Sequence, residues 1–295
     1  MRPVTVLIAA AASMRPHQWL KNLLVFVPLA AAHLLGNRPL LANAALAFVA
    51  FSLCASAVYL LNDLHDIAAD RSHPHKRFRP IASGRLPLSA AIAMIPLLLA
   101  SAAVASSAVG HDVSAVSIAY LVLNLAYTLR FKMVILLDAF VLAAGYALRV
   151  FAGALAVSIV PSARLLAFCI FLFFSLALSK RYAELTLFRT RDGATAHARA
   201  YRLEDLDFIL VLGVSCGVMS VLVLALYLGT SVAEHFYSRS QLIWVTCILL
   251  LYWISHLWLT AHRGRMTDDP LVFAVRNPVS LALVVAMGIT AWLAV

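Results

Sequence analysis

Residues 40–61 read LLANAALAFVAFSLCASAVYLL, an apolar run without a charged side chain. A helix of this length crosses a bilayer core of about 30 Å, which takes roughly 20 residues. The rest of the chain is similar, because 63% of its 295 residues are hydrophobic and only 12% are charged. A soluble domain carries about twice that share of charge. The composition therefore predicts a membrane protein rather than a soluble one.

Nine runs of this kind follow one another along the chain. They lie at 20–35, 40–61, 88–108, 112–130, 133–157, 162–179, 207–229, 240–261 and 278–295. The runs are continuous rather than alternating, so we expect helices and not a β-barrel. The predicted fold class is all-α, a polytopic membrane protein with nine transmembrane helices in one domain over residues 1–295. Gly213-x-x-x-Gly217 in the seventh run is a helix-packing motif, although the same spacing often arises by chance in apolar helices.

Lysine and arginine gather on one side of this predicted topology. Nineteen lie at the N-terminus or in alternate connections, three lie in the opposite connections, and Arg149 lies within a span. Positive residues favour the cytoplasmic side, so we expect the N-terminus and the two long loops, 62–87 and 180–206, in the cytoplasm. The net charge of +10 is spread over short connections. This favours the bilayer and phosphorylated substrates as partners over nucleic acid.

The first long loop opens with Asn62-Asp63-Leu64-His65-Asp66-Ile67-Ala68-Ala69-Asp70-Arg71. A helix would place Asp63, Asp66 and Asp70 on one face, with Asn62 beside Asp66. Three such carboxylates repel one another unless a cation lies among them, and their hard oxygens suit Mg²⁺. A solvated acidic helix end is the alternative. The metal site is favoured because three of only thirteen acidic residues gather here, on the basic side of the chain.

A basic tract, Lys76-Arg77-Phe78-Arg79-Pro80, follows the carboxylates, with Arg71 before it. Ordinary positive-inside charge would explain the tract if it stood alone. Next to a carboxylate triad, the tract favours phosphate binding, with the metal on one side of the phosphate and the arginine guanidinium groups on the other.

These two motifs resemble the first aspartate-rich motif of the UbiA superfamily of intramembrane prenyltransferases. Nine spans with functional loops after the second and the sixth also agree with that family. The resemblance implies a UbiA-like helical bundle in the bacterial inner membrane with catalytic cytoplasmic loops. It also implies that Asp63, Asp66 and Asp70, together with Asn62, hold Mg²⁺ against a diphosphate.

The second long loop departs from the family pattern, which has another D-x-x-x-D there. Residues 179–185 read Ser-Lys-Arg-Tyr-Ala-Glu-Leu, and Lys180 and Arg181 suit direct phosphate binding. With Met14–Asn22 and Asn62–Gly84, this segment looks closest to one branch, decaprenyl-phosphate 5-phosphoribosyltransferase. That branch implies transfer of phosphoribosyl from phosphoribosyl pyrophosphate to a polyprenyl phosphate lipid. Further substrate-binding candidates on these tracts are Lys21, Asn22, Tyr182 and Glu184.

Two charged residues, Asp138 and Arg149, lie inside the fifth predicted span, eleven residues apart and on nearly the same helix face. Intramembrane charges usually face a cavity or a partner, so we expect both to line a shared polar cleft. Snorkelling of Arg149 to the outer interface is the alternative. Tyr127 is a further candidate for contact with a substrate hydroxyl.

Two other functions stay open on these residues. Prenyl transfer from a prenyl diphosphate to an aromatic acceptor shares the first motif but requires a second acidic one. A transporter or flippase for lipid-linked phosphate requires broken helices with charges at the membrane midplane. A homo-oligomer, and either one or two Mg²⁺ ions, are compatible with the motifs.

Overall fold

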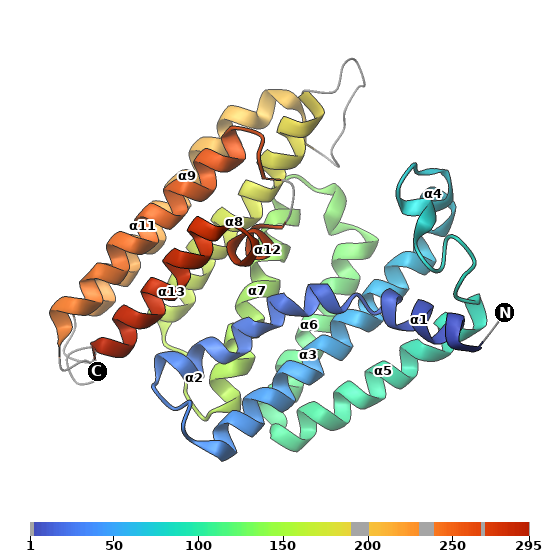
Figure 1. Ribbon diagram of the computed structural model, residues 1–295, viewed down its shortest axis with the longest axis horizontal. Helices are drawn as coiled ribbons and strands as arrows, with labels where there is room; N and C mark the ends of the chain where they lie inside the picture. Colours follow the sequence, from blue (N-terminus) through green and yellow to red (C-terminus); the bar gives the residue numbers. More distant parts are fainter. Residues whose placement is uncertain (1–2, 190–200, 230–238, 267–268, 295) are drawn as a thin grey trace. The chain divides into compact units, whose positions relative to one another are not determined.

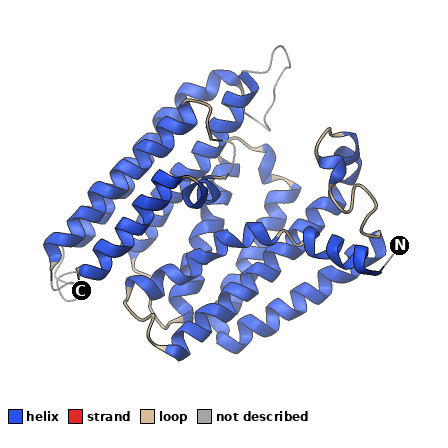
Figure 2. Ribbon diagram, viewed as in Figure 1, coloured by secondary structure: helices blue, strands red, loops and turns tan. Residues whose placement is uncertain are grey.

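The computed structural model describes residues 3–189, 201–229, 239–266 and 269–294. In these ranges the chain forms helices joined by loops and turns, without a strand (Figure 1, Figure 2). Seven helices in the described ranges are long and apolar enough to cross a membrane. They are α3 (Arg38–His65), α5 (Leu88–Val109), α6 (His111–Leu129), α7 (Leu137–Ala156), α8 (Ala163–Arg189), α9 (Leu206–Leu228) and α11 (Ser240–His262). The expected all-α, multi-pass fold is confirmed.

The expected count of nine spans is not confirmed, and the first predicted span is one reason. After α1 (Pro3–Ser13), the chain forms a 3-10 helix, η1 (Pro16–Phe26), and then the short helix α2 (Val27–Ala31). Pro28 has no N–H to continue a helical ladder, and the backbone changes from the 3-10 to the α form beside it. Residues 20–35 therefore do not form one long helix.

The last predicted span is also different. Helices α12 (Pro270–Arg276) and α13 (Pro278–Leu293) are bent by 87° at Asn277, and counting the pair as one span raises the number to eight among the described residues. Asn277 precedes a proline, which disfavours helical backbone at that position, and it has φ −77° and ψ 123°. Its side chain accepts a hydrogen bond from the Ser280 N–H at 3.0 Å and so caps α13.

The second long loop begins later than the predicted boundary at residue 180. Helix α8 continues to Arg189, so Lys180, Arg181, Tyr182 and Glu184 lie on a helix. No glycine or proline interrupts Ala163–Arg189, and Lys, Arg, Glu and Leu favour helix. Residues 190–200, with Arg191, lie outside the described residues. The chain continues through η4 (Leu203–Asp205) into α9.

Contacts divide the chain into two units, which are described separately. Unit 1 consists of Met1–Ala30, Leu34–Thr128 and Leu148–Val160. Unit 2 consists of Ala31–His33, Leu129–Ala147 and Pro161–Val295. Helix α7 contributes its first part to unit 2 and its last part to unit 1. The single domain over residues 1–295 stays a prediction.

In unit 1, helix α3 packs against α5 and η1, with α4 (Ile67–Ser72) and η2 (Lys76–Phe78) following it in the chain. Buried Ala57 and Leu60 of α3 pack in one core cluster with Leu98 of α5. Gly153 marks the closest approach, because a Cβ added there would lie 2.0 Å from the Val25 carbonyl oxygen. Only a glycine allows α7 to meet η1 at this distance.

In unit 2, helix α9 packs against α8 and α11, and the predicted glycine motif lies at this contact. A Cβ on Gly213 would lie 2.2 Å from the Trp258 ring, and one on Gly217 would lie 2.6 Å from Ile254. The Ser175 hydroxyl donates a hydrogen bond to the Gly213 carbonyl at 2.7 Å. The packing role expected for Gly213 and Gly217 is confirmed.

We expect Gly153→Ala to lower the free energy of unfolding by about 1–3 kcal/mol, because the added methyl overlaps backbone that cannot move aside. Gly288→Ala is the matched control, since nothing lies within 4 Å of its added Cβ. It should leave stability unchanged or raise it slightly, as helical alanine does. Thermal unfolding of the purified variants in detergent measures both. Equal stability of the two variants would contradict the close contact of α7 with η1.

Candidate functional site

The acidic motif lies at the C-terminal end of α3 and continues into α4. Helix α3 ends at His65, but the Asp66 N–H still donates to the Asn62 carbonyl at 2.9 Å, and the Asp70 N–H donates to the Asp66 carbonyl at 2.8 Å. This continued helical bonding keeps Asp63 and Asp70 on one side of the chain. Both are only 2% exposed. Of the three carboxylates expected on one face, Asp63 and Asp70 thus lie together.

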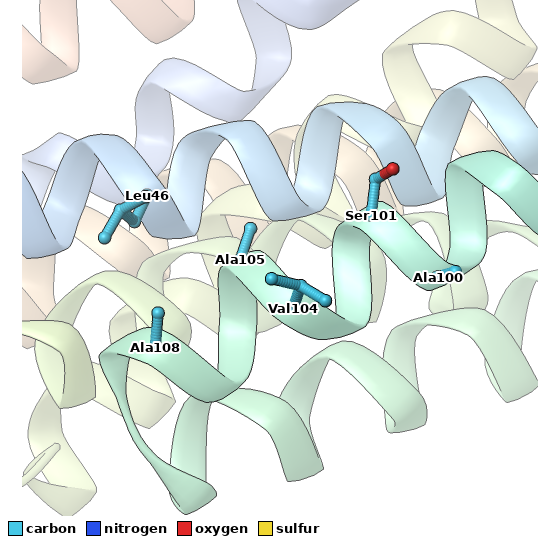
Figure 3. A pocket seen from close by; sticks show the side chains of 6 residues that line it. All are labelled: Leu46, Ala100, Ser101, Val104, Ala105 and Ala108. Atoms are coloured by element: carbon cyan, nitrogen blue, oxygen red, sulfur yellow. The ribbon is translucent and has the colours of Figure 1, made fainter.

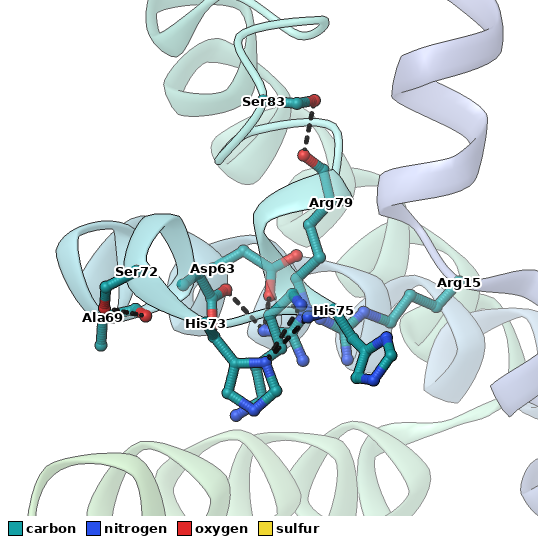
Figure 4. A network of polar contacts seen from close by, with 10 residues as sticks. Arg15, Asp63, Ala69, Ser72, His73, His75, Arg79 and Ser83 are labelled. Carbon is teal, nitrogen blue, oxygen red and sulfur yellow. Dashed lines mark hydrogen bonds and ion pairs between the residues drawn. The ribbon is translucent and has the colours of Figure 1, made fainter.

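Two arginines meet this carboxylate pair (Figure 4). The Arg79 Nη1 atom lies 3.1 Å from Asp63 Oδ1 and 2.6 Å from Asp70 Oδ2. The Arg15 Nη2 atom lies 2.5 Å from the same Asp63 oxygen, and its guanidinium group stacks over the Tyr59 ring. Arg15 reaches Asp63 from a left-handed backbone conformation, φ 53°, which turns the chain between α1 and η1. The two carboxylates are thus neutralised by two guanidinium groups.

The site was expected to contain a third carboxylate, Asp66, but the structure does not bring it into the same group. Asp66 is partly exposed at the junction of α3 and α4. Among the described residues, no three His, Cys, Asp or Glu side chains lie close enough together to hold a metal ion. Mg²⁺ nevertheless needs few carboxylates, and the two buried ones already share one bridging cationic nitrogen. The hard donor set of Asp63 and Asp70 therefore fits a divalent cation.

The neighbouring polar residues have separate contacts. Asn62 accepts a hydrogen bond from the Thr128 hydroxyl at 2.6 Å, and Arg71 donates to the Ala82 carbonyl at 3.2 Å. Lys76 and Arg77 are exposed, and the Arg77 guanidinium lies over the Phe78 ring. Among the described side chains of the basic tract, Arg79 contacts the carboxylates, whereas Lys76 and Arg77 are exposed.

Arg149 lies in a buried polar network in unit 1. It is 5% exposed and donates to the Asn22 side-chain oxygen at 2.6 Å and to the Tyr120 hydroxyl at 2.9 Å. Asn22, fully buried, in turn donates to the Ser52 hydroxyl at 2.9 Å. Arg149 therefore does not snorkel to an interface, and Asn22 orients it. Lys21 and Tyr127 are half-buried.

Asp138 has partners of its own in unit 2. Its carboxylate lies 2.7 Å from Arg181 Nε and accepts a hydrogen bond from the Tyr201 hydroxyl at 2.6 Å. Arg181 also contacts Glu184, one turn along α8. Asp138 is fully buried and Arg181 is 1% exposed. Burial, and then the bond to Asp138, raise the pKa of Tyr201, which therefore stays a neutral donor.

Lys180 differs from Arg181 in its exposure. Its side chain is 27% exposed and lies 3.3 Å from Asp269, which also accepts a hydrogen bond from the Tyr146 hydroxyl at 3.0 Å. Asp269 caps α12 through the Leu271 N–H. Tyr182 is buried, and its hydroxyl bonds His262 Nδ1 at 2.9 Å. Of the two basic residues, Lys180 is thus the one with surface to offer a phosphate.

Sequence reasoning missed four residues that complete these networks. Asp269 had a readable signal, because an aspartate before a proline is typical of a helix N-cap. Arg15 lies in the Met14–Asn22 segment, which carries part of the family resemblance but gave Arg15 no role. Tyr120 and Tyr201 carry no sequence signal, since only tertiary contacts pair them with Arg149 and Asp138.

An apolar groove lies elsewhere in unit 1, between α3 and α5 (Figure 3). Its volume is about 450 Å³, and no charged residue lines it. The lining side chains are Leu46, Ala100, Ser101, Val104, Ala105 and Ala108. Leu46 and Asp63 lie on the same helix, about 25 Å apart along its axis. The groove therefore offers an apolar surface that is remote from the charged end of α3.

Comparison with known proteins identifies the family. A family model described as the UbiA prenyltransferase family matches residues 23–277. The chain is 34% identical over 268 residues to the "Uncharacterized protein y4nM" of Sinorhizobium fredii, covering 90% of this chain and 52% of that one. It is 38% identical to the nodulation protein NoeC of Azorhizobium caulinodans, covering 93% and 89%. The chain thus spans about half the length of the first relative and most of the second.

Two further matches concern a named activity and the fold. A decaprenyl-phosphate phosphoribosyltransferase of Corynebacterium glutamicum is 38% identical over 214 residues, covering 70% of this chain and 64% of that one. A UbiA homolog from Archaeoglobus fulgidus, solved with GPP and Mg²⁺, has a TM-score of 0.69 at 16% identity. That match covers 96% of this chain and 97% of the other. It shows that the two chains share a fold.

The buried pair of Asp138 and Arg181 predicts a stability difference between adjacent basic residues. Arg181→Gln should lower the free energy of unfolding by about 3–5 kcal/mol, because it leaves Asp138 buried without its cation. Lys180→Gln, the adjacent comparison, should cost less, because Lys180 is partly exposed and its partner Asp269 keeps the hydrogen bond from the Tyr146 hydroxyl. In the double variant Asp138→Asn with Arg181→Gln, part of the loss should be recovered. Unfolding in detergent tests this, and equal losses for the two single variants would refute it.

Proposed function

The chain belongs to the UbiA prenyltransferase family, and from this premise we propose that it transfers phosphoribosyl from phosphoribosyl pyrophosphate to a polyprenyl phosphate. The observation that carries the proposal is the second motif. Where aromatic prenyltransferases of the family have a second acidic pair, this chain has Lys180 and Arg181. The name of the Corynebacterium relative supports the same reading. Membership of a transferase family favours an enzyme over a transporter.

The proposed first part of the site binds the donor's diphosphate. Asp63 and Asp70, with Asp66 beside them in the motif, would hold Mg²⁺, which supplies positive charge that stabilises the departing pyrophosphate. Arg15 and Arg79 already lie at the carboxylates and can turn their forks to phosphate oxygens. Exposed Arg71, Lys76 and Arg77 add positive potential that attracts the anionic donor.

In the proposed reaction, an oxygen of the polyprenyl phosphate forms a bond to the anomeric carbon of the ribose. The bond from that carbon to pyrophosphate breaks, and the bonding electrons leave with the pyrophosphate. A phosphate monoester is ionised at neutral pH, so the nucleophile needs no strong general base.

The lipid's tail needs an apolar surface along the spans. The groove between α3 and α5 has this character, and it lies about 25 Å along α3 from Asp63. A polyprenyl chain of that length or more would follow the helix from the charged end into the bilayer. We place the span ends that carry most of the lysine and arginine on the cytoplasmic side of the bacterial inner membrane, because positive residues favour that side.

Prenyl transfer to an aromatic acceptor is the second candidate, and the match to a family described as the UbiA prenyltransferase family favours it. It shares the Asp63 and Asp70 site. The donor differs, because a prenyl diphosphate carries no sugar and therefore no 5-phosphate. Lys180 therefore separates the two functions, since only the phosphoribosyl donor offers it a 5-phosphate.

We expect Lys180→Gln to raise the apparent KM for phosphoribosyl pyrophosphate by about ten- to a hundredfold, the value of a charge-assisted hydrogen bond. The same change should matter little for ribose pyrophosphate without the 5-phosphate, because that donor lacks the contact. Kinetics of the purified variant with both donors measure the difference.

Two controls sharpen this comparison. Asp63→Asn should abolish transfer from both donors, because both carry the diphosphate. Arg38→Gln removes a positive charge at the opposite end of α3 and should change neither KM. If Lys180→Gln impairs both donors equally, Lys180 does not recognise the 5-phosphate and the aromatic prenyl transfer is favoured instead.

A further inference from the structure

A single arginine nitrogen bridges the two buried carboxylates at the end of α3. Arg79 Nη1 contacts Asp63 and Asp70 at once, at 3.1 and 2.6 Å. The side chains of these aspartates are 2% and 3% exposed, so neither is stable there without a positive charge. A divalent cation held by Asp63 and Asp70 would supply the positive charge that this nitrogen supplies here.

We propose that Arg79, with Arg15, is an exchangeable counter-ion. Both arginines neutralise the carboxylates before the donor arrives, and both turn to the donor's phosphates when a divalent cation takes their place. This inference rests on the metal and diphosphate site of the proposed function. It does not depend on whether the transferred group is ribosyl or prenyl.

The charges balance in both states. Two guanidinium groups cancel the two carboxylates in the present structure. A divalent cation cancels the same two carboxylates and leaves both guanidinium groups for the diphosphate. Neither state then leaves a buried charge without a partner, which is the condition for an exchange at low cost.

The exposure of the arginine side chains permits the exchange for Arg15 and Arg79, and burial prevents it for Arg181. The side chains of Arg15 and Arg79 are 23% and 29% exposed, so each has an open side toward which it can rotate. Arg181 makes the same kind of contact but is 1% exposed and lies between Asp138 and Glu184. The change of partner also favours arginine, because its guanidinium group can donate two parallel hydrogen bonds to a phosphate.

The exchange couples the cation to the diphosphate. A free cation must displace Arg79 without giving it a new partner, so it binds weakly. A cation that arrives with a diphosphate gives Arg79 that partner, so the complex binds well. Binding of either component therefore raises the affinity for the other.

Arg79→Gln tests this coupling, because the exchange predicts opposite effects on two ligands. Binding of Mn²⁺ alone to the purified full-length protein in detergent, followed by electron paramagnetic resonance, should tighten by about tenfold, since the competitor is gone. Binding of the Mg²⁺–pyrophosphate complex, followed by calorimetry, should weaken by about tenfold, since a phosphate partner is gone. Arg79→Lys keeps a positive charge and should keep Mn²⁺ binding weak.

Arg85→Gln is the matched control, because Arg85 is exposed and binds the Phe78 carbonyl rather than a carboxylate. It removes the same charge and should change neither affinity. If Arg79→Gln weakens the binding of both Mn²⁺ and the Mg²⁺–pyrophosphate complex, the exchange is wrong and Arg79 only positions the carboxylates. Unchanged affinities would overturn it as well.

Asp70→Asn separates this inference from the proposed function. It should abolish Mn²⁺ binding, and persistence of that binding would reject the metal site on which both proposals rest. Opposite shifts in Arg79→Gln together with no phosphoribosyl transfer would support the exchange and reject only the proposed donor.

Discussion

A carboxylate buried beside a membrane-spanning helix needs a positive charge in contact with it, because an unpaired buried charge costs several kcal/mol. Asp63, Asp70 and Asp138 are each at most 2% exposed, and an arginine meets each of them. Arg15 therefore lies against the end of α3 in contact with Asp63, and Arg79 of the basic tract contacts Asp70 of α4. Each unit therefore contains at least one buried carboxylate held by arginine.

The same pairing serves two purposes, according to how much of the arginine is exposed. Arg181 is enclosed by Asp138 and Glu184, with Tyr201 closing the other side of the aspartate, and therefore holds α8 against the start of α7. Arg15 and Arg79 keep an open side and can change partner. Their chemistry is the same, so burial decides which arginine is structural and which is available to a phosphate.

The sequence allowed the all-α membrane fold, the Asp63 and Asp70 pair and the Gly213 and Gly217 contact to be predicted, because each follows from local spacing. It did not reveal that α8 continues past residue 180, since helix-forming charged residues are compatible with a loop as well. Nor could spacing show that Arg181 is enclosed or that Arg15 meets Asp63. Those pairings join residues far apart in the chain, and tertiary packing selects them.

We propose that a phosphorylated sugar donor binds at the acidic end of α3 and transfers its phosphoribosyl group to a lipid phosphate. The most direct measurement uses the purified protein in detergent with Mg²⁺, polyprenyl phosphate and phosphoribosyl pyrophosphate labelled in the ribose. We expect label to move into the lipid fraction while pyrophosphate is released in equal amount. Absence of this transfer, together with transfer of a prenyl group from its diphosphate to an aromatic acceptor by the same preparation, would contradict it.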